Sequence, residues 1–384
     1  MQFRSKSLVG LLALSLVLLV MLSSCKKGPE AVPVLKIGHV GHDHHTALYV
    51  AAFNGEKFEH DYGIYLKEIR PKELYELYDG GDLICELELF KAGGGSKMPT
   101  AMDQGMFDVG LGGVAAVAFH VDKGRPMKII SPLHSKGDML VISQDLPPTD
   151  WDSFVEYVRT SDEPVKVGFK APKAIALMIF EGALDDVGLS YTYNVGDLEA
   201  DVLLINAKGA KQLNPSLQND IVDAYVCNNP FCAIAEEREI GRCIADLNDL
   251  PPGLWKDHPC CMIGAMDNVI ANQRDILVKF LELIVIATDY MNEDSEIAIQ
   301  SASKWIGTSV DVERNSIPTS GYLTDPNEVW MNGIYTWVST MEELNHIKNC
   351  LKDKTHEEID ELLFDLSLIR EARDNVAKRK TSQQ

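Results

Sequence analysis

The stretch that decides the fold runs from Val34 to Thr46 and reads Val-Leu-Lys-Ile-Gly-His-Val-Gly-His-Asp-His-His-Thr. Its first part, Val34–Val40, is a short apolar run of the length that is typical of a buried strand. A glycine and polar residues follow, and Thr46 then opens a helical pattern whose apolar side begins with Ala47 and Leu48. A strand that leads through a short turn into a helix is the first half of a βαβ unit, so the pattern predicts a largely parallel sheet.

The same alternation continues along the chain in two series. The first predicts strands at Ile64–Ile69, Cys85–Leu89, Asp108–Leu111, Lys128–Pro132 and Met139–Ile142, with a helix that has Pro99 in its first turn and another at Val114–Val121. The second predicts helix Asp150–Val158 capped by Thr149, strand Val165–Phe169, helix Lys173–Val187, strands Val202–Asn206 and Ile221–Val226, helix Phe231–Glu237 and strand Cys243–Asp246. A last strand is predicted at Cys261–Ala265, and the pattern beyond Ala271 is helical.

Two such series predict an α/β protein with two lobes, the second inserted into the first. Residues 34–145 and 250–384 would form the first lobe, including a helical C-terminal tail, and residues 146–249 the second. The chain would cross between the lobes near Ser143–Pro148 and again near Pro251–His258. Because ligands of open α/β sheets bind outside the carboxyl ends of the strands, the two lobes predict one shared cleft.

The N-terminal segment indicates export. Arg4 and Lys6 precede the apolar run Leu8–Leu22, which is shorter than the roughly 20 residues that a spanning helix needs. The end of this run, Leu-Ser-Ser-Cys at positions 22 to 25, resembles the bacterial lipobox. We therefore expect a signal peptide at residues 1–24, a lipid such as palmitate on Cys25, and a tether at residues 25–33. The alternatives are a plain anchor helix or a signal cut elsewhere.

Composition excludes one class of partner. The chain has 384 residues, with 57 Asp and Glu against 36 Lys and Arg, and a formal net charge of -21. A nucleic-acid phosphate backbone needs clustered Lys and Arg, so nucleic acid is not expected as a partner. An anionic ligand would need a local cationic pocket. The chain has eight cysteines, and seven are left when Cys25 is set aside. Because this number is odd, at least one thiol is free or forms a bridge to another chain.

Two glycine-rich loops are candidates for the ligand site. Gly94, Gly95 and Ser96, and also Gly112 and Gly113, lie between a predicted strand and a predicted helix. Glycine there allows backbone N–H groups to approach a small oxyanion at a helix N-terminus, although tight turns alone would explain the same residues. In the second lobe Lys170 offers a positive charge, unless it is only a solvated lysine at a turn, and the amides of Asn228 and Asn229 could bind a polar ligand.

Several short stretches of the sequence, taken in their order along the chain, resemble the nitrate/sulfonate/taurine class of ABC-importer substrate-binding proteins, which has thiamine-pyrimidine relatives. The resemblance rests on residues 36–40 followed by 47–51, on 93–95, 101–110, 124–132 and 221–225, and on Pro230-Phe231 and residues 258–261. It implies a type II periplasmic-binding-protein fold, in which two α/β lobes joined by a hinge close on a solute. It also implies a small-molecule solute and an ABC permease with its ATPase as partners. Together with the lipobox-like Cys25, it leads us to expect a monomer that is attached to the membrane through the N-terminal lipid, on the periplasmic side or the cell surface. The insertion Pro71–Asp82 and the tail after Gly307 depart from short family members.

Histidines are the unusual feature of the predicted site. His39, His42, His44 and His45 crowd the end of the first strand, and the resemblance places His134 and the run from His258 to Cys261 near the junction of the lobes. Imidazole and thiolate are ligands for zinc, nickel, copper or haem iron, so a metal site at His42, His45, His258 and Cys260 is an alternative. We interpret the histidines as contacts to the solute and Cys260 and Cys261 as buried thiols. We expect no cofactor or metal to be bound.

Three functions therefore remain in order of preference. The first is the solute-binding component of an ABC importer for a sulfonate, nitrate, bicarbonate or pyrimidine-like solute. The second is a metal- or haem-binding lipoprotein, and the third is an enzyme similar to the pyrimidine synthases of the same fold. The third is weakened because Cys227 and Cys232 are separated by asparagines and no familiar catalytic motif is present, so we do not expect an enzyme.

Overall fold

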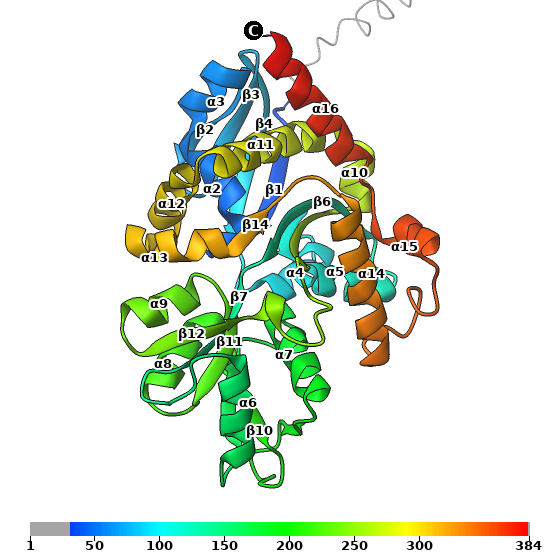
Figure 1. The fold of residues 1–384 in the computed structure, drawn as a ribbon. Coiled ribbons are helices and arrows are strands. Elements are labelled where there is room, and N and C mark those ends of the chain that lie inside the picture. The colour runs from blue at the N-terminus through cyan, green and yellow to red at the C-terminus, as the bar shows by residue number, and fades with distance from the viewer. Residues whose placement is uncertain (1–30, 383–384) are drawn as a thin grey trace, which may run out of the picture. The chain divides into compact units, whose positions relative to one another are not determined.

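The computed structural model describes residues 31–382 (Figure 1). The expected signal peptide and Cys25 lie outside the described residues. Contacts divide the chain into residues 1–33 and residues 34–384, and the following description concerns the second unit.

The first sheet has eight strands in the order β14-β6-β13-β5-β1-β4-β3-β2. Its centre is β1 (Val34–His39), which pairs in parallel with β4 (Asp82–Lys91) on one side and β5 (Val109–Gly113) on the other. The remaining strands are β2 (Ile64–Arg70), β3 (Leu74–Asp79), β6 (Met127–Lys136), β13 (Pro259–Met266) and β14 (Ser320–Tyr322).

Helices cover the first sheet because its central strands are apolar. Leu35 and Ile37 of β1 and Val109 and Leu111 of β5 are fully buried. The covering helices include α2 (Thr46–Phe53), α5 (Val114–Asp122) and the long helix α11 (Arg274–Glu293), and α11 packs on α2. Val34 and Lys36 of β1 are half-buried and the rest of the strand is buried, so most of its residues are apolar, and Val34–Val40 was therefore recognisable in the sequence.

The second sheet has six strands in the order β12-β7-β11-β8-β10-β9. They are β7 (Asp138–Ser143), β8 (Val165–Phe169), β9 (Tyr191–Thr192), β10 (Val202–Asn206), β11 (Ala224–Asn228) and β12 (Gly241–Asp246). Its helices are α6 (Trp151–Thr160), α7 (Ile175–Asp186), α8 (Leu213–Gln218) and α9 (Phe231–Glu237). Strands β8, β10 and β11 are parallel, whereas β7 is antiparallel to β11 and β12.

The chain passes from the first sheet to the second at Gly137, between β6 and β7. This is earlier than the predicted crossing near Ser143–Pro148, because Met139–Ile142 pairs with β11 of the second sheet. Gly137 has φ +83°, and a Cβ there would meet Ser320 Oγ at 2.5 Å and His44 Nε2 at 2.9 Å. Only glycine fits both this backbone conformation and this close approach.

Three local predictions are corrected by the structure. The segment Pro71–Asp82, expected as a polar insertion, contains strand β3, whose Tyr75 and Leu77 are buried while the alternate residues face outward. Helix α6 is capped by Asp150 rather than by Thr149, since the Asp150 carboxylate accepts a hydrogen bond from the Ser153 backbone N–H at 2.9 Å. The tail also contributes a strand, β14, which pairs with β6.

The rest of the C-terminal tail is helical, as predicted. It comprises α10 (Asp267–Asn272), α11, α12 (Ser295–Ala302), α13 (Val310–Ser316), α14 (Glu328–Glu343), α15 (His356–Leu363) and α16 (Ser367–Ser382). Helix α16 lies along α11 (Figure 1), and Arg379 there binds both carboxylate oxygens of Asp79 at 2.8 and 2.7 Å. Within residues 31–382, no helix has both the length and the apolar character needed to cross a membrane.

Candidate functional site

A cavity of about 770 Å³ lies where strand ends of the two sheets meet. The first sheet contributes the residues that follow β1, β4 and β5, and the second contributes those that follow β8 and β10 together with the last residue of β11. These are the carboxyl ends of the parallel strands, where the sequence predicted the cleft.

Positive charge is concentrated in the lining of this cavity. Its six lysines are Lys91, Lys97, Lys170, Lys173, Lys208 and Lys211, and none of the described residues that line it is Asp or Glu. The whole chain carries a formal net charge of -21. The cavity is therefore a local cationic site on an acidic protein, as an anionic ligand requires.

Lys170 is fixed at the end of β8 by a neighbour from β11. Its Nζ donates a hydrogen bond to Asn228 Oδ1, and Asn228 Nδ2 donates to the Asn229 carbonyl at 2.8 Å. Burial by itself opposes the ammonium form, but Cys227, Asp138 and the cysteines of β13 raise the pKa of Lys170 above its usual value. Lys170 is therefore protonated and positively charged at neutral pH.

The two glycine loops contact each other at one end of the cavity. Gly94, Gly95, Ser96 and Gly113 line it, whereas Gly112 is not among the described residues of the lining. A Cβ on Gly112 would meet the Gly95 carbonyl oxygen at 3.0 Å, so the loops could not approach this closely with larger residues. The close approach gives these glycines a packing role in addition to any role in binding.

Two helices from different sheets begin at the cavity. Helix α5 follows Gly113, helix α7 follows Ala174, and neither N-terminal cap residue supplies a side-chain hydrogen bond. Gly113, Ala115, Ala174 and Ile175 line the cavity. The unpaired N–H groups of a helix N-terminus and its dipole favour negative charge.

The histidines after β1 are all buried. His42 and His44 line the cavity, whereas His45 lies deeper, where its Nδ1 accepts a hydrogen bond from the Val40 backbone N–H at 2.9 Å. Burial lowers the pKa of His39 to about 3 and the pKa of His44 to about 4, and it also lowers the pKa values of His42 and His45. At neutral pH these imidazoles are uncharged.

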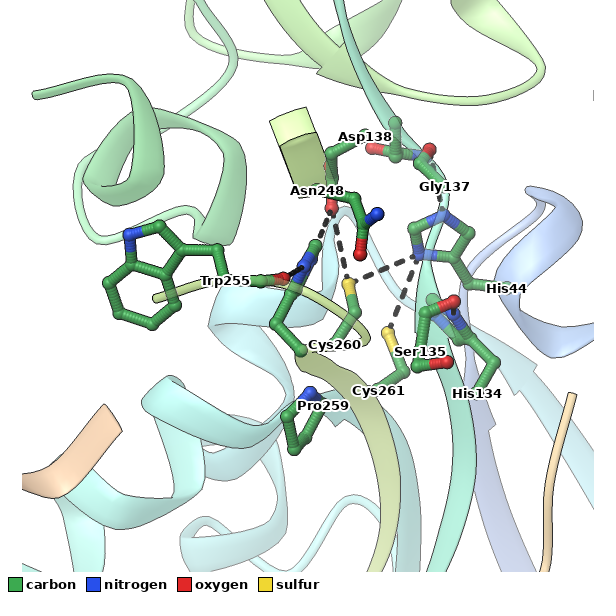
Figure 2. Close-up of polar contacts among 12 residues, drawn as sticks. His44, His134, Ser135, Gly137, Asp138, Asn248, Trp255, Pro259, Cys260 and Cys261 are labelled. Atoms are coloured by element: carbon green, nitrogen blue, oxygen red, sulfur yellow. Dashed lines mark hydrogen bonds and ion pairs between the residues drawn. The ribbon is translucent and has the colours of Figure 1, made fainter. Parts of the chain in front are cut away.

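His44 lies close to three residues that come from two strands of the first sheet (Figure 2). These are His134 from β6 and the adjacent Cys260 and Cys261 from β13, and one nitrogen or sulfur atom from each of the four lies within 4.8 Å of all the others. Nδ1 of His44 is 3.5 Å from Sγ of Cys260 and 3.8 Å from Sγ of Cys261. Neutral imidazole and thiolate are the ligand types of a zinc-class ion.

The thiols of this cluster are in unequal environments. Burial and the neighbouring Cys261 and Asp138 raise the pKa of Cys260. Burial acts on Cys261 in the same direction, but the Cys260 thiol and the imidazoles of His134 and His44 hold the pKa of Cys261 well below its usual range.

A buried carboxylate lies beside the cluster. Oδ2 of Asp138 is 3.4 Å from Sγ of Cys260 and 3.8 Å from Nε2 of His258. Burial opposes ionisation of Asp138, yet His258 and the ammonium of Lys170 lower its pKa to about 2. His258 is oriented through Nδ1, which lies 2.8 Å from the Trp255 carbonyl oxygen.

The structure brings together most of the residues predicted from the sequence. The predicted residues that line the cavity are His42, His44, Gly94, Gly95, Ser96, Gly113, Lys170 and Asn228. The predicted residues that lie outside the lining are His45, Gly112, His134, Asn229 and His258. Of the alternative metal set, only Cys260 belongs to the four-residue cluster, because η1 (Asp43–His45) turns His44 toward the cysteines. Cys227 and Cys232 do not line the described cavity.

Four lysines of the cavity were missed in the sequence. Lys91 ends β4 and Lys97 lies in the short helical turn η2 (Gly95–Lys97) after it, while Lys208 and Lys211 lie in the segment after β10. Each pair lies at or after the end of a strand that was predicted, so a search for cations in these segments would have found them.

Comparison with known proteins agrees with this architecture. The model of the NMT1-like family matches residues 28–307. Uncharacterized protein MJ1180 of Methanocaldococcus jannaschii is 36% identical over 141 residues, which are 36% of this chain and 97% of that protein.

Several solved structures share the fold. The ligand-binding component of an ABC-type import system from Staphylococcus aureus, with zinc bound, has a TM-score of 0.67 at 15% identity and covers 88% of this chain and 99% of its own. The periplasmic nitrate-binding protein NrtA from Synechocystis has a TM-score of 0.67 at 14% identity, with 91% of each chain covered. The alkanesulfonate-binding protein SsuA from Xanthomonas axonopodis, bound to MOPS, has a TM-score of 0.58 at 12% identity, with 89% and 99% covered. The predicted type II periplasmic-binding-protein fold is confirmed.

Proposed function

This chain belongs to the NMT1-like family, and from that membership and its cationic cleft we propose that it is the solute-binding component of an ABC importer. Its solute is an organic or inorganic oxyanion that is held between the two sheets and passed to a membrane permease with its ATPase. The structural relatives named for nitrate and alkanesulfonate binding support this class of solute.

The observation that carries the proposal is the charge of the cavity lining. Six lysines face a cavity to which no described Asp or Glu contributes, on a chain with 57 acidic residues. We would expect carboxylates in the lining of a surface depression that has no binding role on so acidic a protein. Two helix N-termini add further attraction for an anion.

The size of the cavity limits which solutes can fill it. At about 770 Å³ it lies within the range of 300 to 1,000 Å³ that is typical of sites for drug-sized ligands. A bare nitrate or bicarbonate ion would fill only a small part of it. We infer a solute with an anionic group, such as a sulfonate or carboxylate, on an organic body that contacts Ala115, Ile175 and Phe231.

The mechanism is capture and not reaction. Cationic side chains that follow β8 and β10 of the second sheet and the glycine loops of the first sheet line the same cavity, so one anion held there contacts both. A ligand that contacts both walls stabilises the closed arrangement over the open one, and this difference is what a permease can recognise.

The proposed place of action is outside the cytoplasm, on the membrane surface. Export and attachment through a lipid on Cys25 remain proposals from the sequence, as does the monomeric state. Fractionation of cells that express the full chain and its Cys25→Ala variant tests the anchor. The parent chain should stay with the membrane after a salt wash, and the variant should not.

Thermal unfolding with a panel of ligands tests the solute class. The panel contains nitrate, bicarbonate, taurine, longer alkanesulfonates, MOPS and uncharged pyrimidines, each at millimolar concentration. A ligand that binds only the folded state stabilises it by RT ln(1 + [L]/Kd), which is about 4 kcal/mol at 1,000 times Kd. We expect a rise in Tm with an organic sulfonate. A rise only with uncharged compounds would overturn the proposal.

A further inference from the structure

We propose that His44, His134, Cys260 and Cys261 form a binding site for one soft divalent transition-metal ion, of the zinc class, in the wall of the cleft. The site itself is independent of the solute. Contact between the ion and the solute rests in addition on the proposed function.

The first argument is the spacing of the ligand atoms. Tetrahedral coordination with bonds of about 2.0 Å to nitrogen and 2.3 Å to sulfur places nitrogen and sulfur about 3.6 Å apart. Nδ1 of His44 lies 3.5 Å and 3.8 Å from the two sulfur atoms. The widest separation in the cluster stays within 4.8 Å, so contraction by about 1.5 Å at most closes it around an ion.

The second argument is the orientation of the two imidazoles (Figure 2). Nε2 of His44 donates to the Gly137 carbonyl at 3.4 Å, which leaves its Nδ1 lone pair directed toward the sulfur atoms. Nδ1 of His134 donates to the Ser135 carbonyl at 3.1 Å, and Nε2 of His134 is buried with no hydrogen-bond partner. Histidine ligands of metals commonly donate their other ring N–H to a carbonyl or a carboxylate in this way.

The third argument is a distortion of strand β13. Successive residues of a regular strand point to opposite faces, so adjacent cysteines would not share one ion. The pairing of β13 with β6 shifts register between Pro259 and Cys261 and again between Cys261 and Met262. Irregularities of this kind redirect side chains near functional sites. Here both thiols come within hydrogen-bond range of the same nitrogen atom of His44.

The donor set selects the ion. Two thiolates balance the charge of a divalent ion, so the loaded site is neutral and suits a position where His134, Cys260 and Cys261 are at most 5% exposed. Imidazole and thiolate favour zinc, cobalt, nickel or copper over magnesium or calcium.

Three of the four ligands also line the solute cavity, namely His44, Cys260 and Cys261. The ion therefore lies at the boundary between the protein and the space for the solute. A solute that carries a donor atom can reach it there, in addition to the lysines.

Cobalt titration of the reduced full chain tests the site. The protein is purified in detergent without a polyhistidine tag, under anaerobic reducing conditions, and is then titrated with Co²⁺. We expect one equivalent to bind, with thiolate-to-metal charge-transfer absorption and strong visible bands of a tetrahedral ion, and Zn²⁺ to displace it. His134→Gln and Cys261→Ser should each weaken binding at least 10-fold. The matched control is Cys85→Ala, which removes a buried thiol of β4 that does not line the cavity.

Alkylation of the parent chain gives a second measurement that needs no variant. Zn²⁺ should protect Cys260 and Cys261 from a thiol reagent during brief unfolding pulses more strongly than it protects Cys85, because Cys85 is shielded only through the overall stabilisation of the fold. Absence of Co²⁺ binding by the fully reduced chain, or equal binding by Cys261→Ser, would overturn the metal site. The ligand panel is repeated after metal removal, so that persistent anion binding separates failure of this site from failure of the proposed function.

Discussion

The hydroxyl of Ser316 donates a hydrogen bond to the carboxyl group of Asp43, across 273 positions of the chain. Both side chains are fully buried. Asp43 lies between His42 and His44, and Ser316 ends helix α13 in the C-terminal tail. Tyr322 supports the same turn, since its hydroxyl donates to the Asp43 carbonyl at 3.1 Å. The tail therefore holds the histidine turn in place and is part of the site's support.

Replacement of Ser316 by alanine should destabilise the protein and loosen the histidine turn. The change leaves a buried oxygen of Asp43 without its donor, which costs about 1 to 3 kcal/mol. Chemical denaturation should show this loss in the free energy of unfolding. Thr160→Ala is the control, because the Thr160 hydroxyl lies at the exposed end of α6, a helix beside the second sheet. Equal stability of the two variants would contradict the supporting role of the tail.

Replacement of Gly137 by alanine should disturb both stability and the position of His44. A positive φ costs a non-glycine residue about 1 kcal/mol, and the new Cβ would also come within 2.9 Å of His44 Nε2. Gly253→Ala is a matched control, because Gly253 has φ +86° and nothing within 4 Å of a Cβ. We expect Gly137→Ala to lower the free energy of unfolding by at least about 1 kcal/mol more than Gly253→Ala does. A similar loss in both variants would show that the contact with His44 is unimportant.

Much of the fold could be predicted from the sequence because its strands are buried and short. Val165–Phe169, Val202–Asn206 and the helix Phe231–Glu237 have the bounds that were predicted. Each is an apolar run that ends at a polar residue or a turn. Strand β3 was missed because only alternate residues, such as Tyr75 and Leu77, are buried, and the polar residues between them resemble a loop.

The candidate site was predictable in part. Lys170 follows β8 and Asn228 ends β11, and the rule that parallel strand ends meet was sufficient to place them together. The resemblance placed His134 and the run from His258 to Cys261 near the junction of the lobes, but the four-residue cluster was not predictable, because it depends on the register between β6 and β13 and on the irregularity at Cys261. No local pattern in the sequence encodes a pairing between strands more than 100 residues apart in the chain.

Removal of one carboxylate, that of Asp122, should change how stability depends on pH. Asp122 Oδ1 accepts hydrogen bonds from the backbone N–H groups of Asn349 and Leu351 at 2.9 and 3.1 Å, and Oδ2 accepts one from Lys348 N–H at 3.0 Å. Burial opposes the ionised form, but these donors hold the pKa of Asp122 below its usual value. The carboxylate therefore contributes stability above the unfolded pKa of about 3.9, and this contribution is lost as the pH falls toward the folded pKa.

Denaturation of Asp122→Asn at several pH values tests this sign. At pH 7 the variant should be less stable than the parent by about 1 to 3 kcal/mol, and the difference should shrink as the pH falls below about 4. Asp145→Asn, at an exposed position after β7, is the control and should follow the parent at every pH. A difference between Asp122→Asn and the parent that stays constant down to pH 3 would show that packing, and not ionisation, causes the loss.

Neutralisation of Lys170 should weaken solute binding more than it weakens the fold. A hydrogen bond to a charged group contributes about 2 kcal/mol, so Lys170→Gln should raise Kd for the anion about 30-fold. Lys166→Gln is the matched control, because Lys166 lies on the same strand, β8, and does not line the cavity. Calorimetric titration with the best ligand of the panel measures both values. Because this lysine is largely shielded by protein, the loss should persist in 0.5 M salt, whereas a contribution from exposed lysines would be screened. Equal affinity of the two variants would remove Lys170 from the binding site.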